Sequence, residues 1–131
     1  MRVLLDSNVF LWAATGARGI STAGRAVLSD TTNERLLSSV TPWELGIKFS
    51  RNKLDLPSSF LQFIRVAMSD LQVTELPVSI VHALKSAELP LIHGDPFDRM
   101  LVAQCQCDSL TLVTADRVLH AYDVDLVDAR L

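Results

Sequence analysis

Residues 2–6 read RVLLD, a short apolar run that ends in an acid. A strand inside a parallel sheet is buried on both faces and therefore reads as a continuous apolar run. We predict a strand over residues 2–5, with Asp6 at its carboxyl end. The pattern recurs at residues 110–116, LTLVTAD, where a predicted strand over 110–113 is followed by Asp116.

Strand-like and helix-like stretches alternate along the rest of the chain. Further strands are predicted at 35–39, 73–76 and 124–127, and helices at 8–14, 21–29, 42–51, 57–68, 79–87, 96–107 and 117–122. This alternation is typical of a mostly parallel sheet with helices on both faces. The predicted fold is therefore a three-layer α/β/α domain with a central sheet of four to five strands. At 131 residues, the whole chain 1–131 is expected to form one domain.

Two helix starts share one local pattern. In TPWE, residues 41–44, we expect Thr41 as the N-cap, Pro42 as the first helical residue and Glu44 as the third. In DPFD, residues 95–98, Asp95 is the expected N-cap and Asp98 the acid of the first turn.

Asp6, Glu44, Asp98 and Asp116 each lie at a predicted strand-to-helix junction. Such junctions share one rim of a parallel sheet, so we expect the four carboxylates to meet there. Unpaired, they would repel one another, and a divalent cation would remove that cost. Oxygen ligands without a matching His or Cys set indicate Mg²⁺ or Mn²⁺. The sequence thus predicts a metal-dependent enzyme, with phosphodiester cleavage as the favoured chemistry.

Each acid also has a structural interpretation. Asp6 and Asp116 can be helix N-caps, and Glu44 can be half of a capping box. We assign Asp98 as the ligand and Asp95 as the cap, with the reverse assignment open.

Three further side chains are expected beside the ligands. Asp95, Asn8 and Thr114 are predicted to support the carboxylates, and Thr114 can donate to Asp116 or to a metal-bound water. Of the three histidines, only His93, in the loop before Asp95, is a candidate for the edge of the site.

The overall charge does not favour binding of nucleic acid, since the chain has 12 Lys and Arg residues and 15 Asp and Glu residues, a formal net charge of −3. An RNA substrate would have to be drawn by the metal and by local basic residues. Lys48, one turn beyond Glu44, and Arg99, next to Asp98, are predicted to steer the RNA backbone. Ion pairing with neighbouring carboxylates is the alternative for both.

The sequence suggests neither a secretory signal nor a membrane span, so a cytoplasmic protein is expected. Cys105 and Cys107 stand two apart on a predicted helix and are expected to be free thiols. Large apolar side chains exceed what one small core needs, and some are expected to form a groove for a partner helix, with a core position as the alternative for each. The set is Phe10, Leu11, Trp12, Trp43, Phe60 and Phe63.

Four stretches together resemble one known family: LDSN (5–8), TPWELGIK (41–48), HGDPFDRMLVAQ (93–104) and LVTAD (112–116). They are similar to PIN-domain proteins, and in particular to the VapC-type ribonuclease toxins of bacterial toxin–antitoxin pairs. The resemblance covers nearly the whole chain, in the family's order. It implies a PIN-like fold and a Mg²⁺- or Mn²⁺-dependent endoribonuclease, a hydrolase inhibited by a small cognate antitoxin and forming a homodimer. A structured-RNA loop, such as one in tRNA, fits this expectation.

Residue by residue, the family's acids fall on Asp6, Glu44, Asp98 and Asp116, and Thr114 matches its usual Ser or Thr. The pair at residues 7–8, Ser and Asn, departs from many relatives but removes no carboxylate.

Two other readings of the sequence stay open. A phosphatase with an aspartyl nucleophile would also place an Asp after the first strand, but such enzymes usually carry a second acid where Asn8 stands. A non-catalytic binding module would not need all four acids.

Overall fold

The computed structural model describes residues 1–16, 19–56 and 59–131. Its elements are β1 (Arg2–Leu5), α1 (Ser7–Thr15), α2 (Thr22–Ser29), β2 (Glu34–Ser38), α3 (Val40–Ser50), α4 (Phe60–Asp70), β3 (Thr74–Leu76), α5 (Ile80–Glu88), α6 (Pro96–Asp108), β4 (Thr111–Thr114), the 3-10 helix η1 (Arg117–Ala121) and β5 (Leu126–Asp128). The predicted start of the fourth helix at residues 57–58 lies outside the described residues. Within the described ranges no helix is long and apolar enough to cross a membrane.

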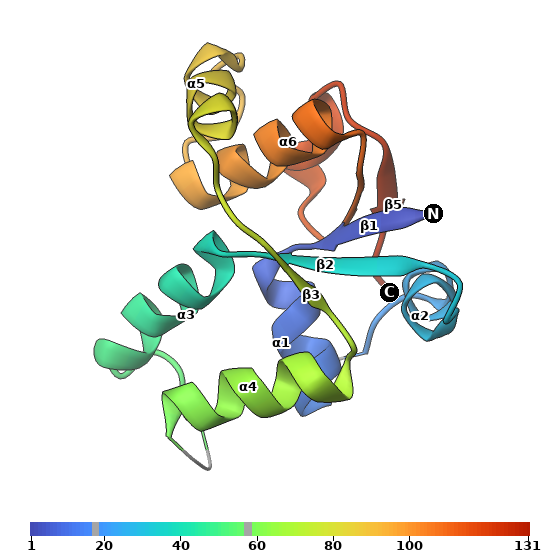
Figure 1. Cartoon of the computed structure of the whole chain (residues 1–131), viewed down its shortest axis with the longest axis vertical. Helices are drawn as coiled ribbons and strands as arrows, with labels where there is room; N and C mark the ends of the chain where they lie inside the picture. Colours follow the sequence, from blue (N-terminus) through green and yellow to red (C-terminus); the bar gives the residue numbers. More distant parts are fainter. Residues whose placement is uncertain (17–18, 57–58) are drawn as a thin grey trace.

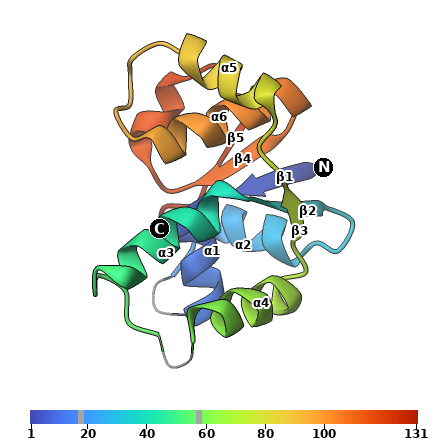
Figure 2. The same cartoon turned by 60° about the vertical axis from the view of Figure 1, so that its left-hand side comes forward.

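The five strands form one sheet in the order β3-β2-β1-β4-β5, and every neighbouring pair is parallel. Helices α1, α2 and α4 lie on one side of this sheet, and α5 and α6 lie on the other (Figures 1 and 2). The predicted three-layer α/β/α fold is therefore confirmed, with five strands.

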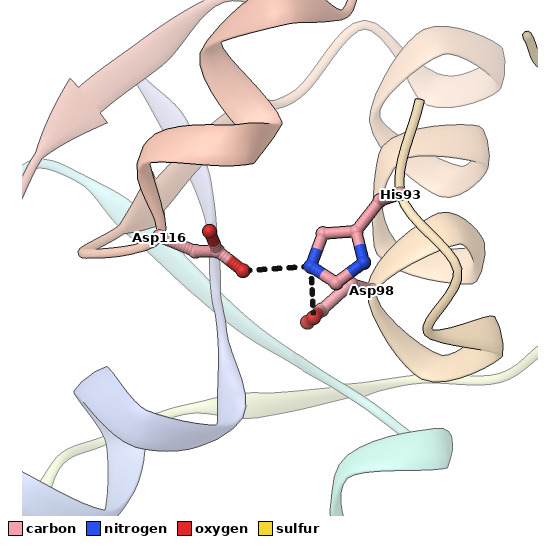
Figure 3. A group of neighbouring side chains, drawn as sticks. All are labelled: His93, Asp98 and Asp116. Carbon is pink, nitrogen blue, oxygen red and sulfur yellow. Dashed lines mark hydrogen bonds and ion pairs between the residues drawn. The ribbon is translucent and has the colours of Figure 1, made fainter. Parts of the chain in front are cut away.

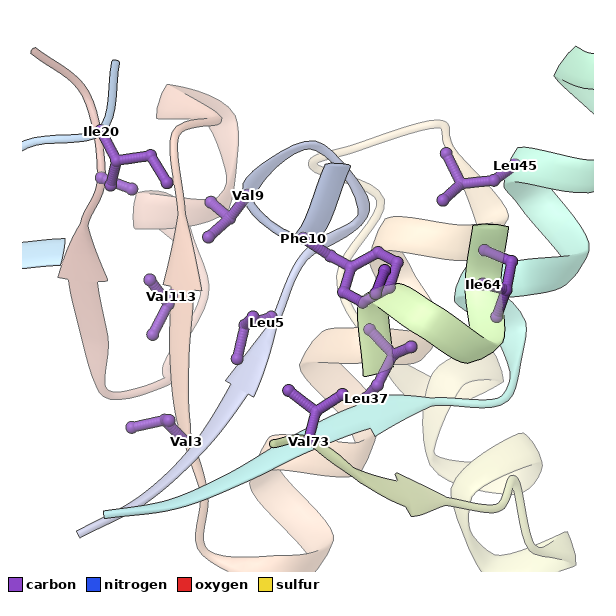
Figure 4. Packing of buried hydrophobic residues seen from close by; sticks show 12 residues of the cluster. Val3, Leu5, Val9, Phe10, Ile20, Leu37, Leu45, Ile64, Val73 and Val113 are labelled. Atoms are coloured by element: carbon purple, nitrogen blue, oxygen red, sulfur yellow. The ribbon is translucent and has the colours of Figure 1, made fainter. Parts of the chain in front are cut away.

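Alternate side chains of the central strands point to opposite faces of the sheet and pack into two separate hydrophobic cores. From β1, Val3 and Leu5 join the cluster under α1 and α4, whereas Leu4 joins the cluster under α6, and all three are fully buried. Figure 4 shows the first cluster, where side chains from the strands point towards Phe10 and Ile64 of the covering helices. Burial on both faces explains the continuous apolar run at the start of the chain.

The strand order changes direction between β1 and β4. From β1 the chain proceeds to β2 and β3 on one side, while β4 and β5 are added on the other. Ligands of open α/β sheets bind in the crevice at such a switch point, outside the carboxyl ends of the strands. Asp6 follows β1 and Asp116 follows β4, so both acids flank this crevice.

Candidate metal centre

Asp6 ends β1 and is the N-cap of α1. Its Oδ1 accepts a hydrogen bond from the Val9 amide at 2.8 Å, and its Oδ2 accepts one from the Thr114 hydroxyl. The side chain is buried, and this burial raises the pKa of Asp6. The bonds from Thr114 and Val9 oppose the rise, and the nearby charge of Asp116 adds to it. The carboxylate is therefore held rigidly in a place where its charge is poorly compensated.

The helix that carries Glu44 begins earlier than predicted. α3 starts at Val40, with Ser39 as the N-cap, so Glu44 is the fifth helical residue and takes no part in a capping box. Pro42 is tolerated at the third position because the first four helical N–H groups have no acceptor within the helix. The prediction of Thr41 as the N-cap is therefore wrong.

Glu44 instead points inward and is fixed by two side chains. Its Oε1 accepts a hydrogen bond from the Ser7 hydroxyl at 2.6 Å, and its Oε2 lies 3.3 Å from Nζ of Lys48. Ser7 is almost completely buried, next to Asp6 in the chain. This role of Ser7 was not predicted, and its position directly after Asp6 was the available signal.

The predicted cap of the helix that carries Asp98 is confirmed. Asp95 is the N-cap of α6, and its Oδ1 accepts from the amides of Phe97 at 2.8 Å and Asp98 at 3.4 Å. The predicted strand-to-helix junction is wrong for Asp98, because α6 follows α5 and a loop. Asp98 reaches the site from a helix start instead.

Like charges surround Asp98. Burial raises the pKa of Asp98 to about 7, and the charges of Asp95, Glu44 and Asp6 add to the rise, while His93 opposes it. Asp98 therefore takes up a proton far more readily than an ordinary Asp when no cation compensates the cluster.

Asp116 is the N-cap of η1, where its Oδ1 accepts from the Val118 amide at 2.9 Å. Thr114 does not donate to this carboxylate, as one of its two predicted roles required. Its hydroxyl donates to Asp6 and accepts from the Asp116 amide at 3.0 Å. Thr114 thus ties the ends of β1 and β4 together.

His93 lies between two of the predicted site acids. Its Nε2 is 2.8 Å from Oδ2 of Asp116 and 3.2 Å from Oδ2 of Asp98 (Figure 3). One donor atom from each of these three residues can be chosen so that all lie within 4.8 Å of one another. The available signal was the place of His93 in the stretch that contains Asp98.

The four acids share one electrostatic field, because Glu44 and Asp6 both raise the pKa of Asp98, and Asp116 raises that of Asp6. Accumulated negative charge on hard oxygen donors is what Mg²⁺ or Mn²⁺ binds. The residues present therefore fit such an ion.

The two predicted RNA-steering residues differ in their surroundings. The Lys48 side chain is 43% exposed and keeps its ion pair with Glu44. Arg99 turns away from the acids, and its guanidinium donates to the carbonyl oxygens of Ser86, Leu89 and Pro90 and to the Tyr122 hydroxyl. These contacts favour a structural role for Arg99.

Asn8 is exposed and lines a hollow of about 510 Å³ beside Asp116.

A second hollow, of about 650 Å³, lies over α1 and α4 and has mostly apolar walls. Of the predicted groove residues, Leu11, Trp12 and Phe63 line it. Phe10 is in the core, Phe60 stacks on Phe49, and Trp43 is exposed and forms a T-shaped pair with Phe97.

Both cysteines are free thiols, as predicted. Burial raises the pKa of Cys105 to about 12, so this thiol is unreactive.

Comparisons with known proteins identify a family and similar folds. Residues 3–125 match the PIN domain model. Similar solved structures include VapBC2 from Rickettsia felis bound to a DNA fragment from its promoter (16% identity, 99% of this chain and 100% of that chain, TM-score 0.73). Others are a toxin–antitoxin complex from Klebsiella pneumoniae (17%, 95% and 95%, 0.66) and VapBC-5 from Mycobacterium tuberculosis (19%, 97% and 98%, 0.64). A search of curated proteins found no match.

Proposed function

The chain belongs to the PIN domain family, and from that premise we propose that it is a divalent-metal-dependent endoribonuclease and the toxin of a toxin–antitoxin pair. One observation supports the chemistry above all: the four acids, from separate segments, lie close enough to act on one another. Glu44 and Asp6 add to the rise in the pKa of Asp98 that burial causes, and Asp116 adds to the rise in the pKa of Asp6. The biological role is supported by the solved structures of similar fold, which are toxin–antitoxin complexes.

In this proposal Asp6, Asp98 and Asp116 hold Mg²⁺ or Mn²⁺, and Glu44 completes the cluster. A cation bound there supplies a water activated for attack on phosphorus and stabilises charge on the phosphoryl oxygens. The chain itself supplies the fixed geometry. Thr114 orients the Asp6 carboxylate, and Ser7 orients that of Glu44.

The nuclease reading is favoured over an aspartyl phosphatase by the contacts of Asp6. A nucleophilic Asp attacks with one carboxylate oxygen, which must be able to turn towards the phosphate. Here Oδ1 of Asp6 accepts from the Val9 amide and Oδ2 from Thr114. This carboxylate is therefore better suited to be a fixed ligand than an attacking group.

RNA that is cut specifically is usually read in unstacked loops. We propose such a loop as substrate, with tRNA as one source, and Lys48 as a phosphate contact at the rim. The antitoxin is proposed to lay an apolar helical face into the groove lined by Leu11, Trp12 and Phe63. A homodimer belongs to the same proposal, and a monomer in sedimentation at micromolar concentration would contradict it.

The test is cleavage of total RNA by the purified, antitoxin-free protein with Mg²⁺ or Mn²⁺. We expect discrete fragments that disappear with EDTA and in Asp98→Asn. The exposed Asp125, outside the site, provides a matched control, and Asp125→Asn should cut like the wild type. Phosphate release from a small ester with intact RNA would favour the phosphatase, and neither activity in folded protein would favour a binding module.

A further inference from the structure

We propose that His93 is a positioning residue of the metal centre, which hydrogen-bonds the carboxylate of Asp116 through an N–H donor, lies against the carboxylate of Asp98, and does not itself bind the metal. The inference rests on the proposed function, because it assigns a role within the same site. It is carried by the contacts of both imidazole nitrogens and by the way the surrounding loop is anchored.

The contact on Nδ1 determines where the imidazole proton lies. Nδ1 of His93 accepts the backbone N–H of Asp95 at 3.0 Å. A neutral imidazole has one protonated and one unprotonated nitrogen. Since Nδ1 is the acceptor, the proton of the neutral ring is on Nε2, and Nε2 is a donor.

That donor faces both predicted ligands. Nε2 lies 2.8 Å from Oδ2 of Asp116 and 3.2 Å from Oδ2 of Asp98, and Figure 3 shows the ring between the two carboxylates. An ionised carboxylate has about four lone-pair positions. One N–H that bonds Asp116 and lies beside Asp98 therefore leaves lone pairs on each acid for a cation.

The loop that carries His93 is attached to both elements that carry the acids. On the η1 side, the Tyr122 hydroxyl accepts from the His93 amide at 2.9 Å and donates to the Pro90 carbonyl at 3.0 Å. On the α6 side, Arg99 donates to the same carbonyl at 2.8 Å. The ring is therefore a fixed bridge between two elements rather than a mobile side chain.

Direct coordination by His93 would break this arrangement. A metal on Nε2 needs an unprotonated nitrogen there, so the proton would have to move to Nδ1. Two N–H groups, that of Nδ1 and that of Asp95, would then point at each other. Groups that hydrogen-bond metal ligands typically contribute a factor of about 10 to 100 in metal affinity. The contacts of His93 fit a group that hydrogen-bonds a metal ligand, and they do not fit a group that coordinates the metal directly.

The experiment measures Mn²⁺ affinity by calorimetry and electron paramagnetic resonance in RNA-free protein at pH 8. His93→Ala removes the donor and is expected to weaken Mn²⁺ binding about tenfold or more. His93→Gln supplies an amide N–H on a long side chain and is expected to restore binding to near the wild-type value. His120→Ala is the control, because His120 is half exposed and lies 4.0 Å from Asp128, outside the site. Circular dichroism confirms that each variant is folded.

A second readout follows the ring itself. The chain has three histidines, so long-range ¹H–¹⁵N spectra can resolve each imidazole. We expect His93 to keep its proton on Nε2 before and after Mg²⁺ is added. A proton on Nδ1 in the Mg²⁺-bound protein would make His93 a ligand and overturn the inference.

The affinities separate the two hypotheses. If the wild type binds Mn²⁺ and His93→Ala binds it equally or more tightly, the positioning role is wrong and the metal site stands. If the wild type does not bind Mn²⁺ at all, the metal site is wrong, and the role of His93 with it.

Discussion

The carboxyl group of Asp98 is the clearest electrostatic feature of the molecule. Its pKa is raised to about 7, first by burial and then by neighbouring acids, against an ordinary value of 3.8. An acid with a raised pKa in the folded state destabilises the fold once the pH exceeds the unfolded value, and the penalty is complete above about pH 7. In the metal-free protein, the ionised carboxylate of Asp98 therefore lowers the free energy of unfolding, and a bound cation would compensate that charge.

Replacing this group should stabilise the metal-free protein. Asp98→Asn is expected to raise the free energy of unfolding by about 1–3 kcal/mol at pH 8, and by less at pH 5, where the native carboxyl is largely protonated. Urea unfolding in EDTA at both pH values measures the difference, with Asp125→Asn expected to match the wild type. A loss of stability in Asp98→Asn at pH 8 would show that the carboxylate is well compensated without metal.

Replacing Lys48 tests whether a single positive charge at the rim contacts the RNA backbone. It is half exposed and paired with Glu44, so it can offer donors to a phosphate at the rim. In an Asp98→Asn background, which prevents cleavage, Lys48→Ala should weaken RNA binding and reduce the salt slope by about 0.7. Lys53→Ala is the control, since Lys53 is exposed beyond the end of α3. An unchanged slope in Lys48→Ala would exclude the phosphate contact.

Arg99 holds helices together, because its guanidinium connects the end of α5 and the following loop to α6. Arg99→Met removes donors from three carbonyl groups and should lower the free energy of unfolding by about 2–4 kcal/mol. Arg117 also follows a site acid but is exposed, so Arg117→Met should change stability little. Full stability of Arg99→Met together with weaker RNA binding would instead support the steering role.

The helices and strands were largely predictable because their signals are local. The apolar run at residues 2–5 and the cap at Asp95 each depend on neighbours within a few residues. The start of α3 was misplaced because Pro42 was assigned to the first helical position, where Pro is most common, although a Pro anywhere in the first turn loses no hydrogen bond within the helix. The contacts of the site were not predictable in the same way. Ser7 meets Glu44 across 37 residues and His93 meets Asp116 across 23 residues, and no local pattern encodes such approaches.

At the scale of the whole domain, a metal at the switch point would join four separate segments. Asp6 follows β1, Glu44 is on α3, Asp98 is in the first turn of α6 and Asp116 follows β4. An ion that binds only when these segments are in place stabilises the entire fold. Metal binding should therefore appear in global unfolding and not only in local contacts.

Added Mn²⁺ is expected to raise the free energy of unfolding by about 2.7 kcal/mol when free Mn²⁺ is about 100 times its Kd. At one fixed Mn²⁺ concentration the gain should be larger at pH 8 than at pH 6, because at pH 6 the ion must displace the proton of Asp98, whose pKa is about 7, and the apparent Kd is therefore higher. Thermal unfolding with and without EDTA measures the gain at both pH values. Asp98→Asn should lose most of it, and Asp125→Asn should keep it. Equal stabilisation of Asp98→Asn would mean that Mn²⁺ binds elsewhere, and the four acids would need another explanation.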